Sequence, residues 1–232
     1  MIAKPVALNN ELHKEFKILP QFSLESVADR HLTPIMLQEF VSAAPHYPIF
    51  FLKNEEANQY NAVAVFGLVE NQNLFIKDGK FEGQYVPANV RAYPFSLAQA
   101  NDDQLVLCIN EESDVVSKTE GQPLFDAEGK ATEFFQGVNK FFQEFIDANN
   151  VSRNITAQLA ELDLFKADGL QYRDAAGNER RVNGFFVIDR EKFEALSDEQ
   201  FLSLRKFGVL PAIYAHFSSL ERIGAIIARL PA

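Results

Sequence analysis

One segment of the sequence, ATEFFQGVNKFFQEFI at residues 131–146, limits the folds open to this chain more than any other. Its apolar residues recur every three or four positions, which predicts an amphipathic helix with one aromatic face. The stripe comprises Ala131, Phe134, Phe135, Val138, Phe141, Phe142 and Phe145. Such a face must be covered, and we interpret it as part of a core in which the helix packs on a sheet. A groove that uses some of these rings to bind a ligand is the alternative.

The first half of the chain is predicted to be rich in strands. Apolar runs with β-branched and aromatic residues predict strands in HYPIFFLK (46–53), YNAVAVFGL (60–68) and DQLVLCI (103–109). The segment NLFIKDGKFEGQYV (73–86) predicts a hairpin, because Asp-Gly suits the positive φ of a tight turn. Residues 1–32 are expected to form an irregular segment packed on the rest, and Thr33 and Pro34 are expected to open a helix.

Helical periodicity dominates the second half, which also contains one predicted hairpin in LQYRDAAGNERRVNGFFVI (170–188). Asn154 is expected to cap a separate short helix, and Ser197 with Gln200 matches the capping box of another. No stretch rich in glycine and serine or in proline, as is typical of a linker, separates the two halves. We therefore predict a single α+β domain over residues 1–232, with a strand-rich first half that contains hairpins and a helix-rich second half packed on it.

Composition excludes several kinds of partner. The formal net charge is −10, with 32 acidic and 22 basic side chains, so the surface should repel nucleic acids and anionic lipids. No window approaches the roughly 20 apolar residues that a membrane span needs. The N-terminal residues contain no apolar signal-peptide core, which predicts a cytoplasmic protein, although export by another route stays open. The single cysteine, Cys108, lies in an apolar run and is expected to be a buried thiol.

The sequence contains none of the common motifs of catalytic, nucleotide or metal sites. The sequence contains no GxGxxG or Walker loop, no GxSxG elbow and no HExxH pair. We therefore predict no cofactor, no metal and no catalytic residue. An alternative polar site combines His46, Asp126 and His216, with His216 as a candidate general base. A histidine among apolar helix residues is more often a core residue, and we favour that interpretation for His216.

The segment QYVPANVRAYPFSL (84–97) contains the best candidate for a ligand site. Its prolines constrain the backbone, which we interpret as a bent strand edge. The candidate ligand-binding residues are Tyr85, Arg91, Tyr93 and Phe95. An arginine among tyrosines can stack on a ring and still offer its planar fork to a carboxylate. We favour an internal carboxylate as the partner of Arg91, and a ligand carboxylate is the alternative.

Several phrases along the chain resemble the bacterial SapC family, which is named for a surface-layer-associated protein. They include NLFIKDGKF (73–81), YVPANVRAYPF (85–95), GQPLFDAEGK (121–130) and LSDEQFLSLRKFGVLPAIYAHFSSLERI (196–223). Val86 departs from the family phrase by separating Tyr85 from Pro87. The resemblance implies a link to surface layers, and family members tend to be encoded near TonB-dependent receptors and halogenase-like flavoproteins. It implies no catalytic residues.

Three hypotheses for function follow from these observations. The first is a soluble, non-enzymatic binding or accessory protein that serves surface-layer assembly or outer-membrane nutrient uptake, with a protein, peptide or small-molecule ligand. The second is an enzyme that acts on a small metabolite or peptide together with a companion oxygenase or halogenase. The third is an interaction module that forms a homodimer. We favour the first, because the catalytic motifs are missing and the 84–97 segment is conformationally constrained.

Overall fold

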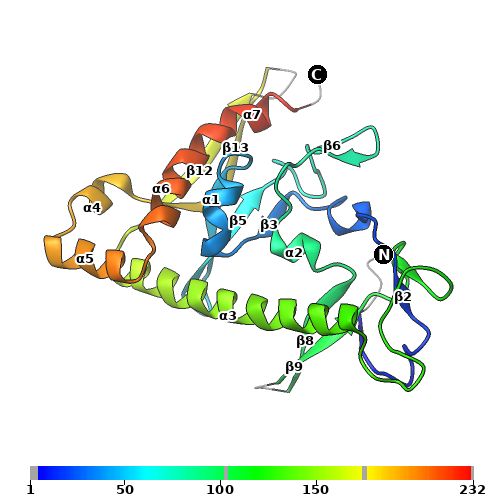
Figure 1. Cartoon of the computed structure of the whole chain (residues 1–232). Coiled ribbons are helices and arrows are strands. Elements are labelled where there is room, and N and C mark those ends of the chain that lie inside the picture. Colours follow the sequence, from blue (N-terminus) through cyan, green and yellow to red (C-terminus); the bar gives the residue numbers. More distant parts are fainter. Residues whose placement is uncertain (1–4, 102–103, 174–176, 231–232) are drawn as a thin grey trace. The chain divides into compact units, whose positions relative to one another are not determined.

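A computed structural model of the chain describes residues 5–101, 104–173 and 177–230. The chain divides into two compact units. Unit 1 comprises Met1–Val27 and Ala88–Ile146, and unit 2 comprises Ala28–Pro87 and Asp147–Ala232. Helices and strands occur in both units, which confirms the predicted α+β class (Figure 1). The prediction that residues 1–232 behave as a single domain stays a prediction.

The described residues of unit 1 form two small antiparallel sheets. Strand β9 (Gln104–Ile109) lies between β8 (Phe95–Asn101) and β1 (Val6–Ala7) in the first sheet. Strand β2 (Lys17–Ile18) lies between β10 (Val116–Ser117) and β11 (Gln122–Pro123) in the second. The unit also contains a 3-10 turn, η1 (Leu24–Ser26), and a one-turn helix, α2 (Ala88–Arg91). Most of its N-terminal segment therefore consists of loops held by short strand pairings.

The aromatic stripe supplies part of the core of unit 1. Phe135 and Phe142 are buried in one apolar cluster with residues of both sheets and of the loops between them. The other members of that cluster are Phe16, Ile18, Ala92, Phe95, Ile109, Leu124 and Phe125. The helix thus packs in the core as its periodicity predicts, and Phe134, Val138 and Phe141 lie partly buried at the edge of the cluster.

The helix that carries the stripe is longer than predicted. Helix α3 spans Glu133–Glu161, with its first half in unit 1 and its second half in unit 2 (Figure 1). The prediction of a separate helix capped by Asn154 is wrong, because Asn154 lies inside α3. No glycine or proline occurs between Ile146 and Asn154, and asparagine disfavours a helix interior by well under about 1 kcal/mol.

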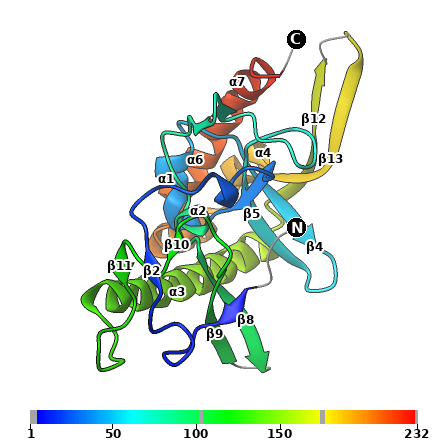
Figure 2. The ribbon, with the colours of Figure 1, turned by 90° about the vertical axis from the view of Figure 1, so that its right-hand side faces the viewer.

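Unit 2 is built around a five-stranded antiparallel sheet with the strand order β12-β13-β4-β5-β3. These strands are β3 (Leu32–Pro34), β4 (Ile49–Asn54), β5 (Gln59–Val65), β12 (Phe165–Arg173) and β13 (Glu179–Ile188). Strands β4 and β5 confirm two predicted strands, and β12 with β13 confirms the predicted second hairpin. Figure 2 shows the far part of this hairpin extending beyond the other strands of the sheet.

The expected helix start at Thr33 and Pro34 is wrong. Both residues belong to β3, which pairs with β5 at the edge of the sheet. Pro34 ends this edge strand, where its missing N–H breaks no ladder. Only short helical turns follow, η2 (Leu37–Glu39) and α1 (Phe40–Ala43). The predicted hairpin around Asp78-Gly79 is confirmed by β6 (Ile76–Lys77) and β7 (Lys80–Phe81).

The remaining helices of unit 2 follow β13. They are α4 (Arg190–Glu194), α5 (Asp198–Lys206), α6 (Leu210–Ser219), η3 (Leu220–Arg222) and α7 (Ile223–Ile227). The capping box of α5 is confirmed: the Gln200 N–H donates to Ser197 Oγ over 3.2 Å, and the Ser197 N–H donates to Gln200 Oε1 over 3.0 Å. Such a pair satisfies two N–H groups that a helix start leaves unpaired.

Replacing Phe142 by alanine should lower the free energy of unfolding by about 3 to 5 kcal/mol, because a buried phenylalanine leaves a cavity. Urea unfolding followed by far-UV circular dichroism measures the change. Lys140→Ala, on the exposed surface of the same helix, is the control and should change stability by less than about 0.5 kcal/mol. If Phe142→Ala unfolds at the same urea concentration as the control, its assignment to the core of unit 1 is wrong.

Candidate functional site

An open groove with a volume of about 770 Å³ lies in unit 1. One wall is formed by residues 91–95, which connect α2 to β8, and the floor by residues 133–142 of α3. Ile18 and Gln122 complete the lining. The groove therefore joins the segment that the sequence indicated as a ligand site to the aromatic stripe.

The floor of the groove is apolar apart from Glu133. Phe134, Val138 and Phe141 line the groove with partly exposed surfaces, and the buried Phe95 and Phe142 also contribute to its lining. The core interpretation of the stripe is therefore confirmed for its buried rings, and ligand binding by the other rings stays a prediction. Rings that face the sheets of unit 1 form its core, and rings at the edge of the stripe line a groove.

Arg91 stands at the C-terminal end of α2, with its side chain exposed at the groove. Its position on a helix corrects the expected bent strand: the Ala92 N–H donates to the Ala88 carbonyl over 2.9 Å, which closes a helical turn after Pro87. Among the described residues, no carboxylate forms an ion pair with the Arg91 guanidinium, and no group accepts a hydrogen bond from it. The favoured internal partner for this arginine is therefore wrong for the described part of the chain.

Tyr93 lines the groove and is held from behind by polar partners. Its hydroxyl donates to Glu25 Oε2 over 2.5 Å and accepts from Asn110 Nδ2 over 2.9 Å. Burial raises the pKa of the Tyr93 phenol, and the hydrogen bond to the Glu25 carboxylate raises it further. The phenol is thus a fixed, neutral part of the groove wall. The peptide bond that follows it, Tyr93–Pro94, is cis.

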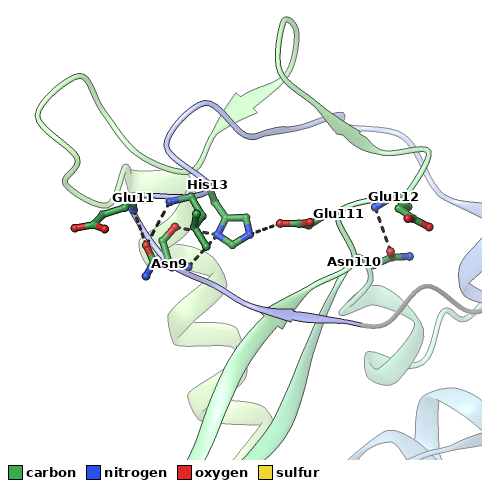
Figure 3. Close-up of polar contacts among 7 residues, drawn as sticks. Asn9, Glu11, His13, Asn110, Glu111 and Glu112 are labelled. Atoms are coloured by element: carbon green, nitrogen blue, oxygen red, sulfur yellow. Dashed lines mark hydrogen bonds and ion pairs between the residues drawn. The ribbon is translucent and has the colours of Figure 1, made fainter.

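A second polar cluster includes Glu111, the residue after Asn110. It connects the N-terminal loop to the end of β9. His13 is fully buried, and its Nε2 lies 2.8 Å from Glu111 Oε1 (Figure 3). Its Nδ1 faces the backbone of Asn9, 2.9 Å from the carbonyl oxygen and 3.0 Å from the N–H. Asn9 Oδ1 in turn accepts from the Glu11 N–H over 2.7 Å.

The residues that hold this site were not among those predicted from the sequence. Glu25 and Asn110 position Tyr93, and His13 with Glu111 fastens the loop around them. His13 and Glu111 are 98 positions apart, so no local pattern connects them. The only indication in the sequence was a histidine among charged residues in NNELHKEF (9–16), which is also typical of a solvent-exposed segment.

Three of the four predicted ligand residues meet at the groove, and one does not line it. Arg91, Tyr93 and Phe95 line it together. Tyr85 belongs to unit 2, where its hydroxyl donates to Glu39 Oε1 over 2.8 Å and its carbonyl accepts from the Tyr47 hydroxyl. These bonds give Tyr85 a structural role inside unit 2.

The alternative polar site is divided between the units: Asp126 belongs to unit 1, and His46 and His216 belong to unit 2. Asp126 is exposed, and its Oδ1 accepts from the Glu128 and Lys130 N–H groups, each over 2.9 Å, which stabilises a turn. His46 is half-buried beside Tyr47. His216 is fully buried against Phe51. Each residue therefore has a structural environment of its own.

The family model of SapC matches residues 8–226, which is nearly the whole chain. The chain belongs to the SapC family. No curated protein and no solved structure matches it.

No group of three or more histidine, cysteine, aspartate or glutamate side chains among the described residues of this SapC chain could hold a metal ion, and no described helix is long and apolar enough to cross a membrane. Cys108 is buried, and burial raises the pKa of its thiol, which disfavours the reactive thiolate.

His216 is a structural histidine of this SapC chain. Its Nε2 accepts from the Ile188 N–H over 3.1 Å, and Ser219 Oγ, which accepts from the Ile49 N–H, donates to the His216 carbonyl. Burial lowers its pKa from the usual 6.5 to about 3, because the enclosed site disfavours the charged ring. The ring is therefore neutral near pH 7.

The lowered pKa of His216 makes stability fall as the pH drops below about 6.5. In that range the unfolded chain binds a proton that the folded chain excludes, down to about pH 3. Between about pH 6.5 and pH 5, the wild-type chain should lose up to roughly 2 kcal/mol through this residue. His216→Gln, which keeps an acceptor but does not titrate, should lose correspondingly less in urea unfolding at the two pH values. His46→Gln is the control, and equal losses in all three proteins would contradict the prediction.

Removing the carboxylate beside Tyr93 should lower the pKa of its phenol. In Glu25→Gln, ionisation of the phenol no longer places two negative charges in contact, so the pKa should fall toward its usual value of 10. An NMR titration of the Tyr93 Cζ resonance measures this shift. Glu15→Gln, an exposed acid of the same unit, should leave it unchanged. An unaltered titration in Glu25→Gln would show that the two residues are not in contact in solution.

Proposed function

We propose that this SapC-family chain is a non-enzymatic binding protein whose groove in unit 1 holds an apolar peptide segment that carries a carboxylate. The segment belongs to a protein partner, and the chain acts as an accessory to that partner. The family's association with surface layers supports surface-layer assembly as the setting, and outer-membrane nutrient uptake is the second setting that the family resemblance implies.

The observation that carries this proposal is the unpaired Arg91 beside an apolar floor. Unit 1 contains no other arginine, and the chain as a whole has 32 acidic side chains that could neutralise it. Among the described residues, no acidic side chain forms an ion pair with Arg91. A guanidinium left free at the edge of a groove is available to a carboxylate from outside, which it can bind through two parallel hydrogen bonds.

The shape and chemistry of the groove favour a peptide over a compact small molecule. Pockets for small molecules bury most of the ligand surface, whereas this groove is open along its length. Phe134, Val138 and Phe141 offer apolar area to side chains of a partner, each buried CH₂ group contributing about 0.8 kcal/mol. Tyr93 is already fixed by Glu25 and Asn110, so little ordering is required of this wall on binding.

The alternative function predicted from the sequence is an enzyme. No observation in the described part of the chain favours the alternative enzyme, whose residues His46, Asp126 and His216 each have structural partners. A cytoplasmic location and a homodimer stay predictions. The homodimer is tested by sedimentation over a series of concentrations, where a mass of one chain at every concentration would contradict it.

Two fluorescent peptides with identical leucine and phenylalanine residues test the proposed function. One carries glutamate between the apolar residues, and the other carries glutamine. Fluorescence anisotropy should show tighter binding of the glutamate peptide, by about tenfold for one charge-assisted hydrogen-bonded pair. Arg91→Ala should remove this preference while it keeps the weaker apolar binding.

Charge reversal provides the sharper version of this experiment. Arg91→Glu should bind a third peptide, with lysine at the same position, more tightly than the glutamate peptide. Lys140→Ala, which removes an exposed cation of α3 outside the groove, should behave as the wild type. If Arg91→Ala binds both of the first two peptides as the wild type does, the groove is not the site.

A further inference from the structure

We propose that unit 2 contains a second binding site, which recognises a polyhydroxylated ligand, that is, a saccharide. The site, which we name the carboxamide groove, consists of two adjoining depressions with volumes of about 620 and 60 Å³ that share Tyr60, Arg153 and Thr156. It lies between the second half of α3 and strand β5 with the turn before it. All of its residues belong to unit 2, so the proposal is independent of the groove in unit 1.

The lining of this groove is dominated by side-chain amides. Six carboxamides from the two facing elements line it, and most of them are exposed. They are Asn58, Gln59, Asn61, Asn149, Asn150 and Asn154. None of their side chains forms a hydrogen bond within the described part of the chain. Each therefore offers a free carbonyl acceptor and two free N–H donors to a ligand.

The charge of the lining contrasts with that of the chain. The protein has 32 acidic residues, yet no carboxylate lines the carboxamide groove. Arg153 is its only cation among the described residues. A largely neutral surface of donors and acceptors favours a ligand that is itself neutral or carries few negative charges, and one guanidinium is too little for a polyphosphate.

Six neighbouring side-chain amides are well suited to form hydrogen bonds with the hydroxyl groups of a ligand. A hydroxyl both donates and accepts, so adjacent ligand hydroxyls can each bind the N–H of one carboxamide and the carbonyl of the next. The larger depression contributes the small residues Ala57, Ala157 and Ala160, which let a sugar ring approach the backbone closely. An extended peptide would instead need pockets for alternate side chains, and this depression has mostly polar walls.

Calorimetric titration of the full chain tests the proposal with defined probes. The probes are maltotriose, cellotriose, chitotriose and trigalacturonate, each up to about 10 mM, and triglycine as a ligand with amides but no hydroxyls. Saturable binding of at least one trisaccharide, without comparable binding of triglycine, is expected. Failure of all four trisaccharides to bind, or equal binding of triglycine, would overturn the proposal.

Variants locate the binding on this surface. The double variant Asn150→Ala/Asn154→Ala removes two free carboxamides at exposed helix positions where alanine favours the helix, so it should fold as the wild type does. It should weaken trisaccharide binding by at least about tenfold, through the loss of two hydrogen bonds. Asn139→Ala, an exposed position of the same helix outside the groove, should leave the affinity unchanged. Undiminished binding by the double variant, or an equal loss in Asn139→Ala, would show that the carboxamide groove is not the site.

Discussion

Unit 1 depends on the burial of the aromatic face of α3. Phe135 and Phe142 pack against both small sheets, neither of which is large enough to form a core without the helix. The apolar stripe is wider than the surface that these sheets cover, so Phe134, Val138 and Phe141 remain at its edge. The same physical constraint therefore produces both the core of the unit and the floor of its groove.

Polar contacts decide how the wall opposite α3 is held. Tyr93 is fixed through Glu25 and Asn110, and the neighbouring Glu111 fastens the N-terminal loop through the buried His13. Arg91 stands at the end of a one-turn helix, two positions before this fixed tyrosine. The arginine thus projects from a backbone that is ordered on both sides, which reduces the entropy that binding would cost. An organised wall beside an unpaired cation is what distinguishes this groove from an ordinary surface depression.

Local sequence patterns predicted the structure correctly where the interacting residues lie close together in the sequence. The capping box of α5, the hairpins and the periodic stripe of α3 all involve residues close in sequence, and the structure contains each of them. Predictions were wrong where tertiary pairing competed with local preference. Thr33 and Pro34 suit a helix start, but pairing with β5 made them an edge strand. The constrained segment around Arg91 was expected to be a strand edge, and Pro87 instead opens a helical turn.

The sequence by itself determined the α+β class, the aromatic helix and membership of the SapC family, because these depend on periodicity and on continuous phrases. It also indicated Arg91, Tyr93 and Phe95 as a group, since they lie within five positions. Only the tertiary structure decided that Tyr85 belongs to another unit, that His216 is enclosed and neutral, and that Arg91 forms no ion pair with a carboxylate among the described residues. Those outcomes depend on which distant segments meet, as His13 and Glu111 do across 98 positions, and chain topology sets such contacts.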